Sequence, residues 1–161
     1  MTASDTHTTP AVRLATTADI DDLVALNVGL FNEDSGTRDP FTRPDGFDRH
    51  KYYAELIADG ERNAVWAADV NGTVVGYLVG RYREANDFRI VSTAVLESMF
   101  VHPVRRNTGV GAALVGAFPQ WAQASAAGSV SVTAYAENMG AVRFYERFGL
   151  RPKHVTLDMA I

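Results

Sequence analysis

The stretch Val101–Leu114, VHPVRRNTGVGAAL, decides how the middle of the chain folds. An extended apolar run ends in it, two arginines precede two glycines, and an apolar run with helical spacing follows at once. A strand, a glycine turn and a helix in this order bring the unpaired backbone N–H groups of the first helical turn to the glycines. The helix dipole adds positive charge there, so the sequence predicts an anion-binding turn.

The residues around this turn favour a phosphate as the anion. Gly109 and Gly111 let the backbone approach a ligand without an intervening Cβ, and Arg105 and Arg106 add positive charge. No acidic residue lies between Glu97 and Glu137, although 19 of the 161 residues are Asp or Glu. Purely structural causes stay open at this point. The glycines suit a tight strand-to-helix turn without a ligand, and an apolar helix also lowers the number of acids.

Two common phosphate loops do not fit this stretch. A dinucleotide fingerprint requires a third glycine at the position of Leu114. A P-loop requires Gly-Lys-Ser/Thr, and no lysine is near. The turn therefore does not indicate a nucleotide-binding protein of either kind.

Composition sets further limits on the class of protein. The chain has 161 residues, of which 47% are hydrophobic, so it can bury the core of one globular domain. A net charge of −4 gives no reason to expect nucleic acid or an acidic membrane surface as the main partner. The lack of cysteine excludes disulfides, thiolate metal sites and a cysteine nucleophile. The four histidines have no metal-ligand spacing, so we expect no metal.

Residues 1–10, MTASDTHTTP, are rich in Thr and Ser, so we expect a disordered leader before one domain at 11–161. The leader has neither the positive charge nor the apolar run of a signal peptide. No apolar run approaches the roughly 18 residues that a membrane span needs. We therefore expect a cytoplasmic protein without a membrane span.

Hydrophobic periodicity predicts an α+β domain with a mixed sheet, in the order β-α-α-β-β-β-α-β-α-β. Asn71-Gly72 predicts a hairpin, Asn138 and Gly149 bound the last helix, and Pro119 should kink or shorten the helix that contains it. A loop is expected at 34–46. Strands are expected at 11–16, 64–70, 73–82, 90–101, 129–135 and 153–161, and helices at 17–31, 47–60, 109–126 and 138–149.

Two motifs resemble those of one family. Val101-x-Pro103-x-x-Arg106-x-x-Gly109-x-Gly111-Ala112 resembles the acyl-CoA-binding motif of GNAT-type N-acetyltransferases, Arg/Gln-x-x-Gly-x-Gly/Ala. Downstream, Asn138-x-x-Ala141-x-x-Phe144-Tyr145-x-x-x-Gly149-Leu150 resembles a second hallmark of that superfamily. The resemblance covers 11–161. It implies a mixed, mostly antiparallel, twisted sheet of six to seven strands, flanked by about four helices, with strands four and five splayed around acyl-CoA.

The resemblance also implies where acetyl-CoA binds. The backbone amides from Arg106 to Ala112 should hold the pyrophosphate, and the strand end from Met99 to Val101 should hydrogen-bond the pantetheine arm. The expected cofactor-binding residues are Met99, Phe100, Val101, Arg105, Arg106, Asn107, Thr108, Gly109, Val110, Gly111, Ala112, Asn138 and Tyr145. The alternative interpretation of Arg105 and Arg106 is that both are ordinary surface arginines, without a role in phosphate binding.

Tyr145 and Glu97 are the expected catalytic residues. By resemblance, Tyr145 protonates the leaving CoA thiolate, although its helical spacing with Phe144 and Phe148 is also that of an ordinary core stripe. Strand alternation places Glu97 on the face of Met99 and Val101, where burial raises a carboxyl pKa unless a cation neutralises the group. By resemblance, Glu97 takes the amine proton, often through water; the alternative is a structural carboxylate.

The expected activity is direct acetyl transfer from acetyl-CoA to a primary amine of a small molecule or peptide, in a ternary complex. The alternative is a non-catalytic acyl-CoA-binding or regulatory module of the same fold. A homodimer that pairs through the C-terminal strands is expected from the resemblance. Acceptor recognition should fall to the first half of the chain, where the candidates are Phe31, Phe41, His50, Tyr52, Tyr53 and Glu55.

Overall fold

The computed structural model describes residues 9–161, so most of the expected leader lies outside the described residues. Its strands are β1 (Ala11–Leu14), β2 (Asn63–Val70), β3 (Thr73–Arg83), β4 (Thr93–Val101) and β5 (Ser129–Val132). Its helices are α1 (Ile20–Thr37), α2 (Arg49–Ala58), α3 (Val110–Ala124) and α4 (Met139–Arg147). Two short 3-10 turns are η1 (Thr17–Asp19) and η2 (Pro103–Arg105).

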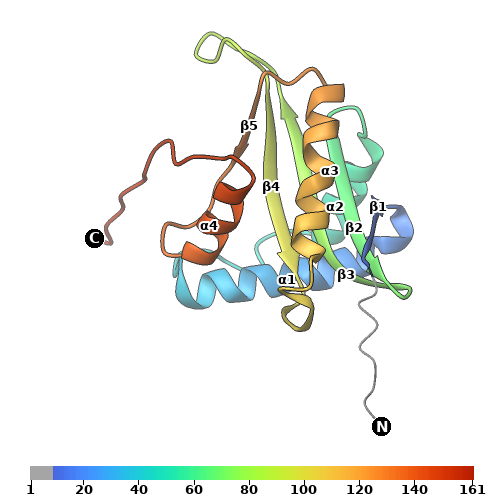
Figure 1. The fold of residues 1–161 in the computed structure, drawn as a ribbon. Helices are drawn as coiled ribbons and strands as arrows, with labels where there is room; N and C mark the ends of the chain where they lie inside the picture. The colour runs from blue at the N-terminus through green and yellow to red at the C-terminus, as the bar shows by residue number, and fades with distance from the viewer. Residues whose placement is uncertain (1–8) are drawn as a thin grey trace.

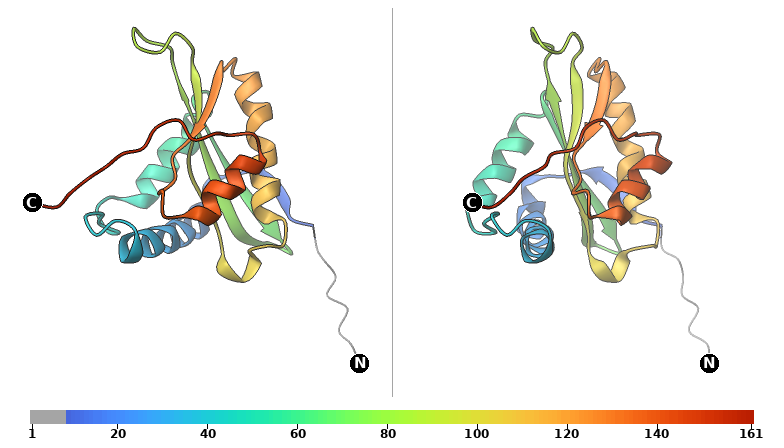
Figure 2. Two further views of the ribbon diagram at one scale, coloured as in Figure 1. Left: turned by 60° about the vertical axis from the view of Figure 1, so that its left-hand side comes forward. Right: turned by 90° about the vertical axis from the view of Figure 1, so that its left-hand side faces the viewer.

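The sheet has the strand order β1-β2-β3-β4-β5, with three antiparallel pairs followed by the parallel pair β4–β5. The helices cover both faces: α3 and α4 lie on one side, and α1 and α2 on the other (Figures 1 and 2). The expected α+β class with a mixed sheet is confirmed. Among residues 9–161, no helix is long and apolar enough to cross a membrane.

Each face of the sheet has its own apolar core. Under α3, Trp66 packs edge-on against Phe118 and Trp121, with ring centroids 6.2 and 5.8 Å away. Under α1 and α2, Tyr77 packs edge-on against Tyr53 at 5.9 Å, and both rings are fully buried. The sheet is thus a shared wall between two cores, and a side chain's face decides which one it joins.

Local signals explain most of the element boundaries. Asn71 and Gly72 adopt positive φ angles of 55° and 81°, as the β2–β3 hairpin requires. The side chain of Asn138 accepts a hydrogen bond from the Ala141 N–H at 3.1 Å, and Gly149 follows α4 with φ of 90°. All three predictions are confirmed.

The expected loop at 34–46 begins too early, because α1 continues to Thr37. The additional turn is held by an Asp34–Arg38 ion pair of 2.6 Å at i,i+4 spacing. The Thr37 hydroxyl also donates to the carbonyl of Glu33 at 2.6 Å. These short-range contacts outweigh the turn-forming composition of the segment.

Helix α3 runs through Pro119 and ends at Ala124, close to the expected end. Figure 1 shows a continuous helix at this point. The packing of Phe118 and Trp121 against the sheet fixes the helix on both sides of the proline. Tertiary contacts therefore offset the hydrogen bond that proline cannot donate.

The expected final strand at 153–161 is wrong. Residues 151–161 form neither helix nor strand and are exposed along their whole length, so the described sheet has five strands rather than six or seven. Alternation alone does not make a strand, because its backbone groups need a neighbouring edge. After α4 the chain runs outward without joining the sheet (Figure 1).

Candidate active site

Strands β4 and β5 separate part-way along their length. Their parallel pairing covers only Thr93–Leu96 and Ser129–Val132. Beyond Leu96, β4 continues to Val101 and remains paired with β3, while no strand of the described chain covers its other edge. No strand in the part of the chain that the structure describes pairs with the backbone groups on that edge, where the Val101 carbonyl accepts a hydrogen bond from Arg106 Nε at 3.0 Å. The expected splay of strands four and five is confirmed.

The open edge of β4 leads directly to the glycine turn. Gly109 is the N-cap residue of α3 with φ of 92°, and Asn107 also has a positive φ, of 60°. Residues 102–109 are all exposed. The Ala113 N–H is the first to bond back into the helix, to the Gly109 carbonyl at 3.0 Å. In the described residues, the three N–H groups before it stay unpaired at the mouth of the turn, as an anion site requires.

The two glycines of the motif have different roles. A Cβ on Gly109 would meet nothing within 4 Å, so glycine is required there by the positive φ. A Cβ on Gly111 would lie 3.4 Å from the Phe144 ring, which packs α4 against α3. The Thr108 hydroxyl closes the turn by donating to the Arg105 carbonyl at 2.7 Å. One glycine shapes the turn and the other brings α4 close to it.

The structure places the two arginines in different surroundings. Arg106 Nη2 lies 2.6 Å from Glu33 Oε1 on α1, and Arg106 Nε donates to the Val101 carbonyl at 3.0 Å. Its guanidinium also lies 5.1 Å from the centroid of the Phe100 ring. Arg105 is exposed and makes no ion pair within the described part of the chain. Glu33 brings a carboxylate to a turn whose own sequence has none.

Tyr145 packs into the core under α3 and is only 9% exposed. Burial raises the pKa of its hydroxyl to about 12, so the group stays protonated at physiological pH. That hydroxyl makes no hydrogen bond to another described residue. Met99 and Val101 of β4 border the same core. Tyr145 is therefore a core residue whose hydroxyl stays a proton donor, and its catalytic role remains a prediction.

The expected face of Glu97 is wrong. Val79 lies opposite Ser98 and Gly80 opposite Leu96, so Glu97 is an extra residue, a β-bulge. A bulge breaks the alternation and re-aims a side chain. Met99 and Val101 face α3, whereas Glu97 contacts α2 on the opposite side of the sheet.

Two side chains hold Glu97 on that side. The Tyr52 hydroxyl of α2 donates to Oε2 at 2.7 Å, and Arg81 of β3 lies 3.3 Å from Oε1. A cation that neutralises the carboxylate is thus present. Burial and the bond to Glu97 raise the pKa of Tyr52 well above its ordinary value, so Tyr52 remains a donor. The Glu97 side chain is 28% exposed and can still reach water.

A buried arginine, Arg49, holds together side chains of α1, α2 and the loop between them, close to Tyr52. Arg49 is 8% exposed and has no carboxylate partner in the described residues. Its Nε donates to Asn27 Oδ1 at 2.7 Å, and its Nη2 donates to the Pro44 carbonyl. The guanidinium packs against two neighbouring rings, 5.1 Å from the centroid of Phe31 and 4.6 Å from that of Phe47. Arg49 therefore fastens the α1–α2 loop, residues 38–48, to α1.

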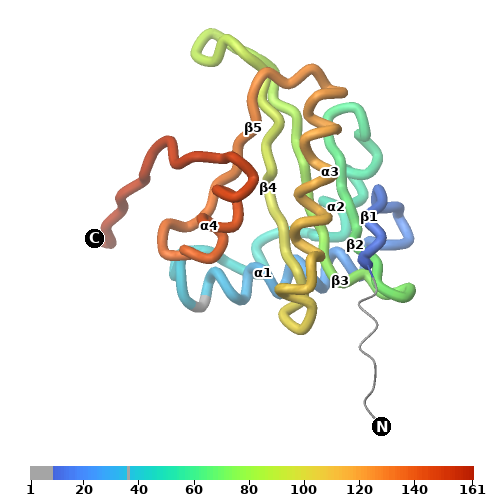
Figure 3. Tube along the Cα trace, in the orientation of Figure 1, coloured from blue at the N-terminus to red at the C-terminus, as the bar shows by residue number. Residues whose placement is uncertain are grey.

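The α1–α2 loop connects both sides of the site. Phe47 packs edge-on against Tyr52 at 5.5 Å, which links the loop to Glu97. At its other end, Asp39 accepts a hydrogen bond from the Tyr135 hydroxyl at 3.2 Å. Tyr135 precedes α4, and the loop lies near that helix in Figure 3. The loop thus connects Tyr52 of α2 with Tyr135, the residue that lies before α4.

The structure separates the acceptor candidates. Phe31 contacts Arg49 and Tyr52 contacts Glu97, whereas Tyr53 is fully buried in the core. His50 pairs with Asp21 at 3.0 Å on the surface. Phe41 is exposed, and Glu55 lines a recess of about 300 Å³ with Tyr52, Asp59, Asn63, Leu56 and Arg81.

Sequence reasoning missed Glu33, Arg49 and Arg81. No periodicity or motif marks them, because their partners lie far away along the chain. Arg81 reaches an acid on the next strand, and Arg106 reaches back to a helix near the N-terminus.

A sequence profile of the acetyltransferase (GNAT) family matches residues 30–150. That range contains the splayed strands, the glycine turn and α4. The chain belongs to this family. The resemblance of the two motifs is thereby confirmed, whereas the roles of individual residues remain predictions.

Two relatives by sequence are N-acetyltransferases. An uncharacterized N-acetyltransferase of Methanocaldococcus jannaschii is 24% identical over 155 residues, which is 91% of this chain and 63% of that protein. The chain therefore spans less than two thirds of that relative. A type 1 aminoglycoside N(6')-acetyltransferase of Stenotrophomonas maltophilia is 29% identical over 114 residues, 70% of this chain and 67% of that protein.

Solved structures share the fold. A tetramutant of the BH1408 protein from Bacillus halodurans aligns with a TM-score of 0.82 at 19% identity, over 94% of this chain and 99% of that one. The aminoglycoside N-acetyltransferase AAC(6')-Iy in complex with CoA aligns with a TM-score of 0.74 at 16% identity, over 94% of each chain. These similarities confirm the GNAT fold.

Proposed function

We propose that this protein transfers an acetyl group from acetyl-CoA directly to a primary amine of a small molecule or peptide. The observation that carries this proposal is the open edge of β4, which is followed, after the short η2 turn, by the unpaired N–H groups at the start of α3. An extended arm that ends in a pyrophosphate matches that shape and charge. The AAC(6')-Iy structure of the same fold contains CoA, which supports this donor.

The donor contacts follow from the backbone. The β4 edge from Met99 to Val101, with Phe100 between them, pairs with the amide groups of the pantetheine arm. The turn from Asn107 to Ala112 receives the pyrophosphate. Arg105 is free to join it, whereas Arg106 must first leave Glu33. Asn138 already caps α4, and that role is compatible with a contact to the arm.

The chemistry divides between the two faces of the sheet. A neutral amine attacks the thioester carbonyl carbon, a C–N bond forms, and the C–S bond breaks to release the CoA thiolate. A backbone N–H of β4 polarises the carbonyl oxygen. Glu97, fixed by Tyr52 and Arg81, accepts the amine proton through water. Holding both substrates together supplies much of the acceleration.

Tyr145 assists the leaving group from the other face. With a pKa of about 12, its hydroxyl is a stable donor. Complete transfer of that proton to a thiolate whose pKa is about 8.5 is uphill. Tyr145 therefore acts by donating a hydrogen bond to the sulfur as negative charge develops there.

A small-molecule amine is the acceptor that the relatives favour. The S. maltophilia relative is named for aminoglycosides, which are polyamines. In this chain, Glu55 and Asp59 line the recess beside Tyr52 and Arg81. Carboxylates at its rim suit a substrate with several ammonium groups. We also propose that the enzyme acts in the cytoplasm as a homodimer.

The test is CoA release measured with a thiol reagent across a panel of aminoglycosides, polyamines, amino acids and short peptides. The protein has no thiol to interfere. A direct transfer gives intersecting double-reciprocal plots when both substrates vary, whereas parallel lines would overturn the ternary mechanism. Acetyl-CoA binding without release by any amine would instead favour the non-catalytic acyl-CoA-binding module.

A further inference from the structure

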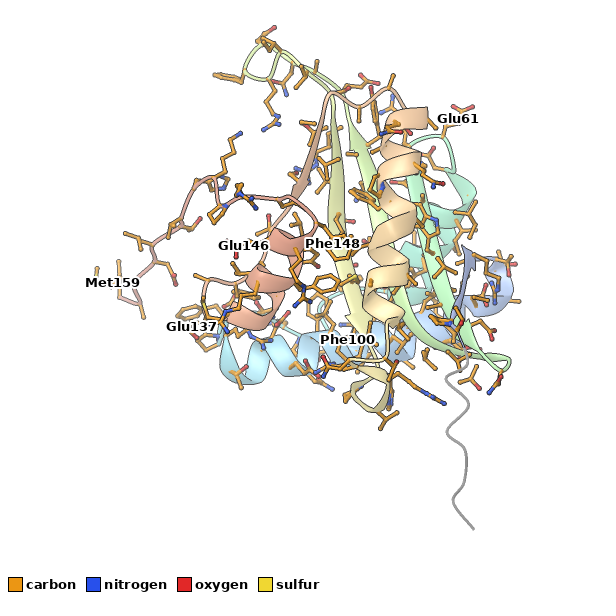
Figure 4. The ribbon with its side chains drawn as sticks, in the orientation of Figure 1. Glu61, Phe100, Glu137, Glu146, Phe148 and Met159 are labelled. Atoms are coloured by element: carbon orange, nitrogen blue, oxygen red, sulfur yellow. The ribbon has the colours of Figure 1, made fainter. Side chains whose placement is uncertain are left out.

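A recess of about 360 Å³ lies between α1 and the end of β4. Its wall contains Asp22, Ala25, Leu26, Gly29 and Glu33 of α1, and Phe100 of β4 on the opposite side. Figure 4 shows Phe100 where the end of β4 meets α1. The helix lies against this ring at Gly29, since a Cβ there would be 3.0 Å from it. This α1–β4 recess shares no lining residue with the recess beside Tyr52.

The α1–β4 recess has a carboxylate at each end. Asp22 and Glu33 are eleven residues apart on α1, which is about three turns, so both project from the same side of the helix. They lie about 16 Å apart along its axis. Between them the wall is formed by Ala25, Leu26 and Gly29, which have no polar side-chain atoms. Asp22 makes no ion pair with another described residue.

This distribution of charge selects the chemistry of a ligand. An apolar middle with negative charge at both ends complements an alkyl chain that carries a positive group at each end. Burial of the methylene groups supplies affinity, and the two carboxylates set the distance between the positive groups. A short diamine reaches only one carboxylate at a time, and a monoamine has only one charge to offer. An elongated dication is therefore the ligand that fits both ends.

One end of the recess is in direct contact with Arg106 of the glycine turn. Glu33 Oε1 lies 2.6 Å from Arg106 Nη2, and the Arg106 guanidinium lies 5.1 Å from the centroid of the Phe100 ring. Arg106 Nε donates at the same time to the Val101 carbonyl on the open edge of β4. An ammonium group at Glu33 competes with Arg106 for that carboxylate. Occupation of the recess and the position of Arg106 are therefore linked.

We propose that the α1–β4 recess binds an elongated alkyl diamine, with one ammonium group at Asp22 and the other at Glu33. The second ammonium group takes Glu33 from Arg106, so the guanidinium turns to the pyrophosphate and the Val101 carbonyl becomes free for the pantetheine arm. The diamine and the donor then strengthen each other's binding, because coupling between two sites is reciprocal. The diamine site stands by itself, whereas its coupling to the donor rests on the proposed function.

The first experiment measures the binding of straight-chain amines to the full chain by calorimetry, without acetyl-CoA, so that no transfer takes place. The diamine with ten carbons between its nitrogens should bind about fivefold more tightly than the monoamine of the same length, which can pair with one carboxylate only. It should also bind more tightly than the diamine with four carbons. Equal affinity of the ten-carbon diamine and the monoamine would overturn the two-carboxylate site, as would the lack of any binding.

Substitutions then locate the ten-carbon diamine. Asp22→Asn should weaken its binding by up to about fivefold and remove its advantage over the monoamine. Ala25→Arg fills the middle of the recess with a cation and should abolish the binding, whereas Gln123→Arg adds the same charge to an exposed position of α3 and should not. Asp59→Asn removes a carboxylate from the recess beside Tyr52 and should leave this binding unchanged. Loss in Asp59→Asn with full binding in Asp22→Asn and Ala25→Arg would place the diamine beside Tyr52 and contradict the proposal.

The second experiment measures the coupling with CoA, which has no acetyl group to transfer. CoA affinity should rise by up to about fivefold when the ten-carbon diamine is saturating, and Arg106→Ala should remove this rise. An unchanged CoA affinity in the wild-type chain with the diamine bound would refute the coupling. A chain that binds the diamine and not CoA would contradict the proposed donor, and the diamine site would stand on the first experiment alone.

Discussion

The proposed donor side and the proposed acceptor side of the site are built in different ways. The donor side consists of backbone groups that lie close together in the sequence, along the end of β4 and the turn before α3. The acceptor side consists of side chains from α1, the α1–α2 loop, α2, β3 and the β4 bulge. A site made of local backbone leaves a motif in the sequence. One made of distant side chains leaves none.

Two contacts join these sides. Arg106 of the turn pairs with Glu33 of α1, and Tyr135 before α4 bonds to Asp39 of the α1–α2 loop. Both are exposed and thus weak alone. They nevertheless connect the two sides, and a substitution can remove either contact without the other.

The largest expected effect comes from breaking the backbone turn with Gly109→Glu. A side chain at φ of 92° costs about 1–2 kcal/mol, and a carboxylate beside the pyrophosphate adds repulsion. Acetyl-CoA binding, measured by calorimetry, should weaken at least about 10²-fold. Gly116→Glu is the matched control, because it adds the same charge to an open, exposed position of α3. Equal binding by both variants would place the pyrophosphate elsewhere.

The next effect separates chemistry from donor binding. Tyr145→Phe keeps the ring packing and removes the buried hydroxyl, so kcat should fall by about 10²-fold while acetyl-CoA affinity stays nearly constant. Steady-state kinetics and calorimetry together measure the difference. Tyr82→Phe removes a hydroxyl from β3 as a control. Unchanged turnover in Tyr145→Phe would leave Tyr145 as a core residue only.

A smaller effect should be confined to the acceptor side. Arg49→Met removes two hydrogen bonds and the stacking that fasten the α1–α2 loop, while it also relieves the cost of a buried charge. We expect about 1–2 kcal/mol less unfolding free energy and an amine KM raised by about tenfold, with acetyl-CoA affinity unchanged. Arg49→Lys should restore part of the KM. An equal loss of affinity for both substrates would mean that the two sides are not separable.

A weaker effect tests the connection itself. Glu33→Gln releases Arg106 from its ion pair, so the guanidinium becomes available to the pyrophosphate. Acetyl-CoA binding should strengthen by up to about fivefold, the range of an exposed pair. The change should disappear when Arg106→Ala is combined with it. Weaker binding in Glu33→Gln would show instead that Glu33 positions Arg106 for the donor.

The last prediction is that kcat does not fall as pH rises through about 10. Burial raises the pKa of Tyr145 to about 12, so the protonated donor persists as pH rises through the ordinary tyrosine value of about 10. The kcat profile with a good amine should therefore rise as the amine loses its proton and then stay level in that range. A decline with an apparent pKa near 10, lost in Tyr145→Phe, would contradict the raised pKa.

The acceptor side also shows where sequence reasoning stopped. The charges that surround Glu97 and the turn cannot be found by scanning neighbouring positions, because Glu33 and Arg81 come from other elements. Strand alternation failed at Glu97, because one extra residue on β4 turns the side chain to the other face. Nothing in the local pattern of β4 signals a bulge, since it is defined by the register with β3.

The sequence by itself determined the order of most elements, the β2–β3 hairpin, the caps of α4 and the glycine turn before α3. These depend on φ angles, side-chain caps and periodicity within a few neighbouring residues. Only the tertiary structure decided the partners of Glu97 and Arg106, the burial of Arg49 and the unpaired state of residues 151–161. Each of these depends on which distant edge or charge the fold brings within hydrogen-bond reach. The backbone turn therefore depends on consecutive residues. The contacts among side chains of α1, α2, β3 and β4 form only when the two cores have packed against the sheet.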